Sequence, residues 1–199
     1  MAYSKFTIQR LKQEYNIKII DNISLLEKKI IEPSSWLKET LNMGMSSPLL
    51  SEKARSELLI TPILQEIRKE NNQKISIFSG INLDADTEND LNGECDFILV
   101  KGDKKHIIDI PIFAIVEAKK QDIDMGIAQS IAQIIGAKIF NNNNNNNIKT
   151  IFGCVTTGEI WQFMKLTEDF TIIIDTNRFY IDNVPEILGA LQQIIDFYD

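Results

Sequence analysis

The sequence predicts an α/β protein. Apolar runs of strand length, rich in β-branched and aromatic residues, alternate with stretches in which apolar residues recur at helical spacing. From residue 47 onward the predicted order is a helix, three strands, a second helix and then further strands, which is typical of a sheet covered by helices. The chain has 199 residues, of which 44% are hydrophobic and 25% charged, and this is enough for one domain with a substantial core.

Residues 1–46 are expected to form a mainly helical appendage to a main domain at residues 47–199. Two short helical patterns flank an extended segment at residues 17–20, and Pro33 opens the second of these helices. No residue pattern here indicates chemistry. We therefore expect the appendage to pack on the main domain and to serve in homodimer formation or substrate contact.

The first helix of the main domain is predicted over residues 51–67. Leu59, Ile63 and Ile67 recur at helical spacing and give the helix an apolar face for the sheet. Pro62 lacks a backbone N–H, so it is expected to bend this helix or to break it locally.

Three strands are predicted next, at residues 74–80, 92–100 and 112–120. Residues 101–105, Lys-Gly-Asp-Lys-Lys, have the composition of a turn. Two strands joined by a short polar connection usually pair antiparallel, so the second and third strands predict a hairpin. Residues 74–80, which end at a glycine, are expected to complete a three-stranded meander.

Charged residues continue one face of the third strand. Alternation predicts that Phe113, Ile115, Glu117 and Lys119 share a face, with Glu117 and Lys119 roughly 6 to 7 Å apart along the backbone. The hairpin brings Asp96 close to Glu117, because both lie at the strand ends farthest from the turn. Two carboxylates and a lysine are therefore expected to converge at one edge of the sheet.

Neighbouring carboxylates raise each other's pKa unless a cation keeps them ionised. A divalent cation that prefers oxygen ligands suits Asp96 and Glu117, with Mg²⁺ expected and Mn²⁺ as a substitute, and it would keep positions for water and phosphate oxygens. Lys119 would then orient an attacking water, or help to deprotonate it, and stabilise developing charge on the phosphoryl group.

Asp96, followed by Glu117-Ala118-Lys119 at the end of an apolar strand, resembles the signature of the PD-(D/E)XK nuclease superfamily. Cys95 stands where that family usually has a proline before the first acid. The resemblance implies that Asp96, Glu117 and Ala118 hold the metal and that Lys119 acts on the attacking water.

The resemblance covers about residues 51–156 and implies a restriction-endonuclease-like fold. That fold has an αβββαβ core with a mixed central sheet and helices on both faces. The implied function is a Mg²⁺-dependent nuclease that hydrolyses phosphodiester bonds of nucleic acid, with DNA the expected substrate and RNA left open. The alternative is a nuclease-like fold without activity that binds a protein or a nucleic acid.

The resemblance also implies a further acid on the first helix of the core. Glu57 is our choice, and Glu52 and Glu66 are alternatives. The competing interpretation of Glu57 is a solvent-facing side chain beside Lys53 and Arg55.

A helix is predicted over residues 121–140, with Asp122 or Asp124 as its cap. Gln129 lies within two turns of its start and is expected to face the metal site, with exposure at the flank of the core as the alternative. Residues 141–147 are all asparagine and are predicted to form a mobile surface loop.

The last third of the chain is predicted to return to β structure. Residues 150–156 and 159–166 flank Thr157-Gly158 and predict a hairpin, and residues 171–175 a further strand. A C-terminal helix is expected to begin after Asn183 as its cap.

Charge and cysteine content narrow the function classes. The net charge of −7 argues against strong, sequence-independent binding of nucleic acid over a broad surface. A nuclease is still compatible with this charge, because metal ions can neutralise the acids of its site and lysines can be concentrated locally. The lysines on or beside the central hairpin are either such local cations or solvated turn residues: Lys101, Lys104, Lys105, Lys119 and Lys120.

The two cysteines, Cys95 and Cys154, lie in predicted strands, and with His106 as the single histidine they exclude a zinc site of the Cys/His kind. No apolar stretch approaches the length of a membrane span, and the N-terminus lacks a signal-peptide core. We therefore expect a cytoplasmic protein without a membrane partner.

Overall fold

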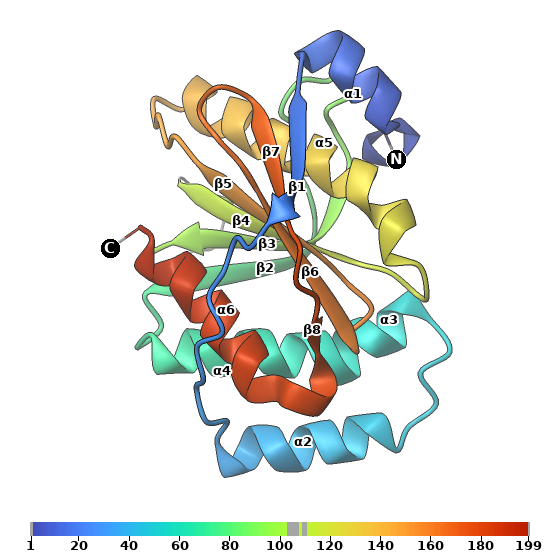
Figure 1. Ribbon diagram of the computed structural model, residues 1–199, viewed down its shortest axis with the longest axis vertical. Coiled ribbons are helices and arrows are strands. Elements are labelled where there is room, and N and C mark those ends of the chain that lie inside the picture. The colour runs from blue at the N-terminus through green and yellow to red at the C-terminus, as the bar shows by residue number, and fades with distance from the viewer. Residues whose placement is uncertain (1, 103–107, 109–110, 199) are drawn as a thin grey trace.

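The structure is a computed structural model, and it describes residues 2–102, 108 and 111–198 (Figure 1). These residues form an α/β fold around an open, mixed, eight-stranded sheet. The strands are β1 (Lys18–Ile23), β2 (Ile75–Asn82), β3 (Glu94–Lys101), β4 (Ile112–Ala118), β5 (Ile151–Thr156), β6 (Ile160–Leu166), β7 (Thr171–Asp175) and β8 (Phe179–Tyr180). The α-helices are α1 (Ile8–Tyr15), α2 (Ser35–Met45), α3 (Glu52–Arg55), α4 (Thr61–Glu70), α5 (Ile123–Asn143) and α6 (Val184–Asp196). Shorter helical segments are η1 (Tyr3–Lys5), the π-helical η2 (Ser56–Ile60) and η3 (Ile181–Asn183).

The strand order is β1-β7-β6-β5-β4-β3-β2, with β8 paired to β6. β4 pairs antiparallel with β3 and parallel with β5, and β1 pairs parallel with β7. The predicted meander of β2, β3 and β4 is confirmed, as is the hairpin of β5 and β6. Because β4 and β5 run in the same direction, their carboxyl ends meet at one edge of the sheet.

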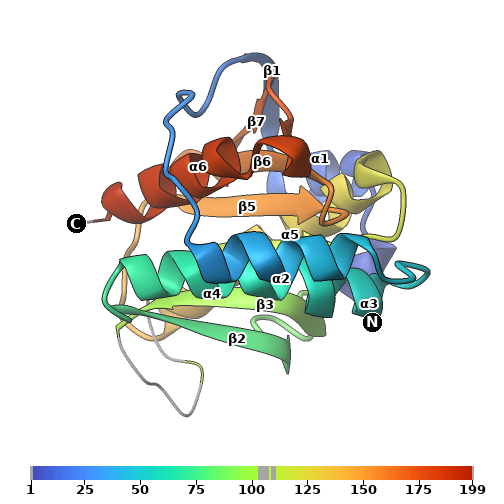
Figure 2. The ribbon, with the colours of Figure 1, turned by 90° about the horizontal axis from the view of Figure 1, so that it is seen from below.

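Helices cover both faces of the sheet (Figures 1 and 2). One apolar cluster joins a face of the sheet to α2, α4 and α6, and a second joins the opposite face to η1, α1 and α5. Burial of these apolar faces is the main favourable contribution to the stability of such a fold. Within the described ranges, no helix is both long and apolar enough to cross a bilayer.

The N-terminal segment belongs to the sheet and is not a separate appendage. The extended segment predicted at residues 17–20 lies within β1, which pairs with β7 at the edge of the sheet. Farther along, α2 packs on η2 and α4. The boundary at residue 46 therefore does not separate two folding units, because the strand that the segment contributes is completed only by pairing with the C-terminal part of the chain.

The predicted helix at residues 51–67 is formed by α3, η2 and α4 in succession. The predicted disturbance at Pro62 is confirmed, because the turn before it is π-helical and the amide of Thr61 donates to the carbonyl oxygen of Ser56. Pro62 has no N–H to offer the Leu58 carbonyl oxygen, and Gly44 of α2 packs closely against that carbonyl. The π-helical turn shifts α3 by about a residue relative to the face of α4.

Two details of the meander differ from the prediction. The pairing of β3 with β4 shifts between Leu99 and Val100, so Phe113 is an extra residue in β4. Phe113 therefore packs in the cluster with α4 and α6, while Ile115 packs in the cluster with α5. β2 continues through Gly80, which has a positive φ of 65°, and does not stop there.

The predicted turn after β3 falls largely outside the described residues. Lys104, Lys105 and His106 all lie there, so their predicted roles have no structural counterpart.

The asparagine run is not a loop throughout, as α5 extends to Asn143. Asn141 is buried, and its Nδ2 donates to the carbonyl oxygen of Ile112 (2.7 Å) while its Oδ1 accepts from the Ile112 amide (2.9 Å). This amide group therefore joins the end of α5 to the start of β4. The remaining asparagines of the run are exposed or partly exposed.

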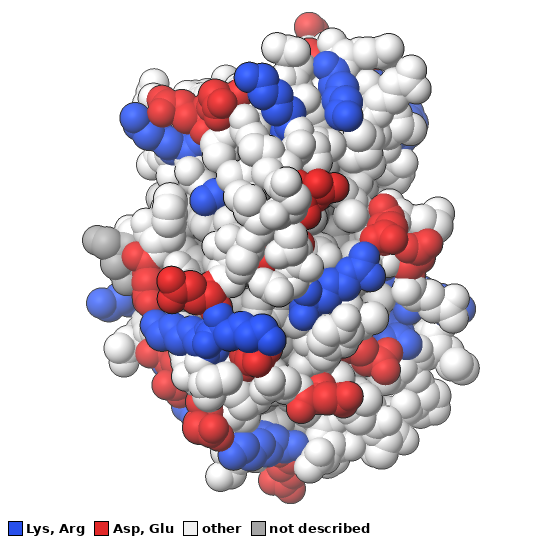
Figure 3. Space-filling model, viewed as in Figure 1, with Lys and Arg blue, Asp and Glu red and all other residues white. Residues whose placement is uncertain are grey.

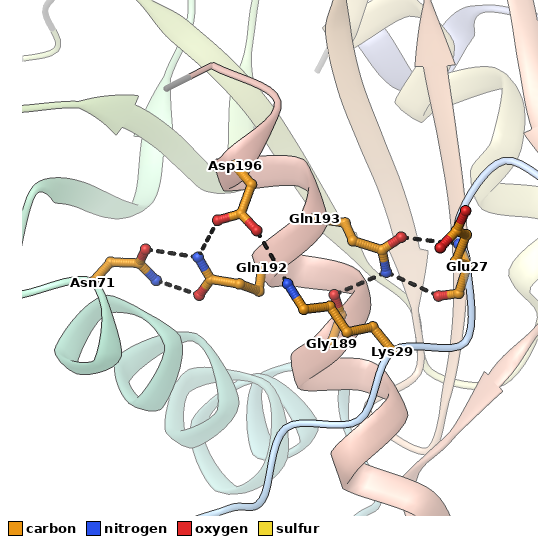
Figure 4. Close-up of polar contacts among 7 residues, drawn as sticks. All are labelled: Glu27, Lys29, Asn71, Gly189, Gln192, Gln193 and Asp196. Atoms are coloured by element: carbon orange, nitrogen blue, oxygen red, sulfur yellow. Dashed lines mark hydrogen bonds and ion pairs between the residues drawn. The ribbon is translucent and has the colours of Figure 1, made fainter.

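α6 is held between the end of α4 and the segment that follows β1 (Figure 4). Asn71 and Gln192 exchange two amide hydrogen bonds, of 2.8 and 2.9 Å. On the other side, Gln193 donates to the carbonyl oxygen of Glu27 (2.9 Å) and accepts from its amide (3.0 Å). Asn183 precedes the helix as predicted, but its side chain makes no capping hydrogen bond.

Candidate functional site

The predicted polar cluster lies where β3 and β4 diverge. The last pair of their ladder is Phe97 with Val116. Beyond this pair, the Asp96 side chain and not a backbone group accepts the next hydrogen bond from β4. Asp96 Oδ2 accepts a hydrogen bond from the Ala118 amide at 2.7 Å. The Asp96 carboxylate is thereby fixed at the edge of the sheet, beside the carboxyl end of β4.

Glu117 is the centre of the cluster and only 2% exposed. Its Oε1 accepts from Lys119 Nζ at 2.6 Å and also from Gln129 Nε2. Its Oε2 accepts from Gln133 Nε2 at 2.6 Å. Lys119 Nζ also donates to Gln129 Oε1 at 3.3 Å, so these four side chains form one connected network.

The start of α5 positions this network. Asp122 caps the helix by accepting from the amides of Asp124 and Met125, as one of the two predicted alternatives requires. Gly126 then allows α5 to approach the sheet, because a Cβ there would lie 2.6 Å from Val155 Cγ1 and 3.0 Å from Lys119 Cγ. The absence of a side chain at this position therefore leaves room for the stem of Lys119.

Both carboxyl groups resist ionisation in this environment. Burial raises the pKa of Asp96, and the Glu52 carboxylate adds to this effect, whereas the Ala118 amide and Lys119 oppose it. Burial, and after it the charge of Asp96, raises the pKa of Glu117 from an ordinary 4.5 to about 7. These are the shifts expected of two acids that share a buried site without a cation.

The structure brings together Asp96, Glu117, Lys119 and Gln129, the set that the sequence predicted to converge. Glu57 does not join them, since its side chain is 63% exposed and its Oε1 lies 3.9 Å from Lys53 Nζ on the surface of the helix.

The two alternatives to Glu57 behave differently from each other. Glu66 is buried elsewhere, where it accepts from the Ser34 amide at 2.7 Å. Glu52 is exposed, yet it is the helix acid whose charge acts on Asp96. Of the three acids considered, Glu52 is therefore the one whose charge reaches the cluster.

Gln133 is the member that the sequence analysis missed. It lies one helical turn beyond Gln129, is completely buried, and its Oε1 has no hydrogen-bond partner among the described residues. A signal was present, because two glutamines at a spacing of four occupy one face of an otherwise apolar helix. Buried amides at such positions need a polar partner, which here is Glu117.

The donor set is the one that a hard divalent cation prefers. Asp96 and Glu117 supply carboxylate oxygens, and Ala118 lies between Glu117 and Lys119 with a backbone carbonyl. In the part of the chain that the structure describes, no group of three or more His, Cys, Asp or Glu side chains is arranged to hold a metal.

The described residues on the face drawn in Figure 3 do not form a broad basic patch. On the face drawn in Figure 3, lysine and arginine side chains are interspersed with aspartate and glutamate. This mixture agrees with the net charge of −7. Any affinity for nucleic acid on this face therefore has to come from local contacts and not from long-range attraction.

Comparison with protein-family models gives no match for this chain. Comparison with curated proteins gives no significant match either.

Proposed function

We propose that the chain is a metal-dependent nuclease that hydrolyses phosphodiester bonds of nucleic acid, with DNA as the expected substrate. The observation that supports this best is the convergence of Asp96, Glu117 and Lys119 at the diverging ends of β3 and β4, with the Asp96–Ala118 hydrogen bond at 2.7 Å and the Lys119–Glu117 ion pair at 2.6 Å. Two acids and an amine in this order along a hairpin are the chemical elements of a two-carboxylate phosphodiesterase site.

The order of elements supports a restriction-endonuclease-like core. The helix formed by α3, η2 and α4 is followed by β2, β3 and β4, then by α5 and β5, which is the order αβββαβ. β4 is flanked by antiparallel β3 and parallel β5, so the sheet is mixed. This arrangement agrees with the fold that the sequence resemblance implies.

A bound Mg²⁺ would supply positive charge to the phosphate and to a water that attacks it. Asp96, Glu117 and the carbonyl of Ala118 are the groups that would hold it. Gln129 and Gln133 fix the orientation of the Glu117 carboxylate, one at each oxygen. A preorganised acid reduces the rearrangement needed when substrate binds.

Lys119 is the group that would act on the attacking water. Its ammonium is held by Glu117 at 2.6 Å and by Gln129 at 3.3 Å, with 18% of the side chain exposed. From this position Lys119 orients the water by a hydrogen bond and stabilises the negative charge that develops on the phosphoryl oxygens.

A second candidate is a nuclease-like fold that binds a partner without catalysis. One observation favours it, because both oxygens of Glu117 already accept hydrogen bonds from Lys119, Gln129 and Gln133, and these donors compete with a cation. Calorimetric titration separates the two candidates. The nuclease binds Mg²⁺ or Mn²⁺ and loses this binding in Asp96→Asn, whereas the binding module shows no metal binding.

Cleavage of circular and linear DNA with Mg²⁺ or Mn²⁺, against an EDTA control, tests the activity. Asp96→Asn retains an acceptor for the Ala118 amide, and Lys119→Ala removes the ammonium, so both should abolish cleavage while the fold is kept. Lys149→Ala is the matched control, because this lysine is exposed and pairs with Glu168 in a different part of the molecule. Metal-dependent cleavage that persists in both site variants would remove the assignment.

A further inference from the structure

A cavity of about 310 Å³ opens near the chain segments that follow β4 and β5, and none of the cluster residues Asp96, Glu117, Lys119, Gln129 and Gln133 lines it. Lys120, which follows the cluster residue Lys119 directly, lines it from the end of β4. Thr157 lines it from the β5–β6 turn, next to Thr156, whose carbonyl oxygen accepts from the Lys119 amide at 2.8 Å. One side of the cavity is therefore one residue along the chain from Lys119 and from Thr156, which binds the Lys119 amide.

The far wall of the cavity carries an aromatic ring. Tyr180 of β8 is 50% exposed and lines the cavity, and its backbone is fixed by pairing with Ile160 of β6. The next amide, that of Ile181, donates to the carbonyl oxygen of Glu159 at 2.8 Å. The ring is thus attached to a rigid part of the sheet, and an exposed aromatic face on a rigid element is a suitable platform for stacking.

Two cations, Arg55 and Lys120, and two acids, Glu159 and Asp182, line the cavity, so its charges balance and do not select a phosphate as its occupant. The Arg55 guanidinium is already engaged by the Glu159 carboxylate and by the Thr157 carbonyl oxygen at 3.0 Å. Glu159 and Asp182 both line the cavity and would repel an anion. Among the described residues, the buried Arg55 Nε finds no acceptor, so a neutral ligand with hydrogen-bonding edges fits this wall better.

A volume near 300 Å³ is at the small end of ligand sites and suits a group of nucleoside size. Aromatic stacking together with carboxylate acceptors is how proteins recognise an unpaired base, since aspartate and glutamate accept from an exocyclic amino group. A base inside a duplex is stacked on its neighbours and cannot enter such a cavity unless it leaves the helix.

We propose that this cavity holds an unpaired nucleobase of the substrate strand, next to the scissile phosphate. Tyr180 stacks on the base and Asp182 accepts from its exocyclic amine. The substrate is therefore single-stranded or locally unpaired nucleic acid, a conclusion that rests on the proposed nucleic-acid substrate. Stacking also supplies affinity that a chain of net charge −7, with mixed charge on its surface, cannot draw from long-range attraction.

Fluorescence anisotropy tests this with the full chain in EDTA, so that binding is measured without cleavage. The probes are labelled 12-nucleotide strands of deoxycytidine or thymidine, and a labelled 12-base-pair duplex. We expect the deoxycytidine strand to bind more tightly than the thymidine strand, and both to bind more tightly than the duplex. Tyr180→Ala should weaken binding of the single strands about tenfold, which is within the range for loss of one base–aromatic stack, and Tyr180→Phe should restore it.

Trp36→Ala is the matched control, because Trp36 is a similarly exposed aromatic residue (48%) on α2 that does not line this cavity. It should bind all probes as the wild type does. Deoxycytidine monophosphate is added as a competitor, and the proposal predicts that it competes weakly because a strand also contacts the protein through its neighbouring nucleotides. Competition by the mononucleotide at the concentration of the strand would instead indicate a site for free nucleotide and overturn the proposal.

The binding readout separates this inference from the nuclease assignment. If Tyr180-dependent binding of single strands is observed but no metal gives cleavage, the cavity is supported and the catalytic assignment fails. If duplex DNA is cleaved and Tyr180→Ala changes neither binding nor cleavage, the cavity assignment fails while the nuclease stands. Equal binding of the two strand sequences would remove the role given to Asp182.

Discussion

Replacing Asp96 by asparagine should stabilise the metal-free protein at pH 8 and remove its response to Mg²⁺. Asparagine keeps an oxygen for the Ala118 amide, which Asp96 binds at 2.7 Å, so the end of β4 remains tied. The change removes one of the two negative charges from the buried site. Glu117 then ionises without a neighbouring carboxylate, and the cation loses a ligand.

The magnitude follows from the pKa of Glu117. Burial and Asp96 raise it from 4.5 to about 7, and since one pKa unit corresponds to about 1.4 kcal/mol, ionising Glu117 costs the metal-free fold about 3 kcal/mol. A raised pKa means that this stability is fully present below pH 4.5 and is lost as the pH rises through 7. Asp96 is the second cause after burial, so Asp96→Asn should recover a minor share, about 1 kcal/mol or roughly 3 °C in Tm.

Thermal and urea denaturation between pH 5 and pH 8, in EDTA and in Mg²⁺, provide the test. At a Mg²⁺ concentration 100 times its Kd, the wild type should gain about 3 kcal/mol at pH 8, and Asp96→Asn should gain little. Glu57→Gln removes an exposed carboxylate from the nearby helix and should follow the wild type. Parallel stability curves for wild type and Asp96→Asn over this pH range, with equal Mg²⁺ effects, would refute the reasoning.

Three further substitutions test packing, the first at the site and the other two elsewhere in the fold. Gly126→Ala should displace Lys119 and lower cleavage about a hundredfold with the fold retained, as circular dichroism and kinetics would show; full activity would mean that the lysine stem has room to move. Asn141→Ala should lower the free energy of unfolding, measured by urea denaturation, by at least about 2 kcal/mol, because it leaves the buried amide and carbonyl oxygen of Ile112 without a hydrogen-bond partner. Asn142→Ala, at an exposed neighbour, should leave this free energy unchanged. Gly189→Ala should lower the urea midpoint strongly, since a Cβ there would overlap a backbone carbonyl of the segment that crosses α6; an unchanged midpoint would show that this contact is loose.

The cluster of Asp96, Glu117, Lys119 and Gln129 was predictable because its members are set by local rules. A polar connection of a few residues predicts the hairpin, the hairpin predicts that Asp96 and Glu117 meet, and the start of a helix after Lys119 predicts the position of Gln129. Each inference spans one turn or one strand pair. Over such short separations along the chain, residue pattern and spacing are enough to predict which side chains meet.

The predictions that were wrong depended on departures from regular geometry. One extra residue in β4 moved Phe113 to the opposite face, because side-chain alternation reverses after a bulge. Composition also misled at Asn141, since a homopolymer gives no sign of which of its members is buried.

The pairing of β1 with β7 could not be predicted from the sequence, for a different reason. Parallel strands require a long connection, and nothing in residues 17–20 specifies a partner so far along the chain.

That pairing has a consequence for how the chain reaches its native state. The amide of Leu26, just after β1, donates to the carboxylate of Asp175, a partner 149 residues away in the sequence. During synthesis β1 therefore leaves the ribosome long before β7 has been made. Until then β1 has no strand to pair with. Such distant contacts slow folding, so we expect the edge of the sheet and α6 to assemble last.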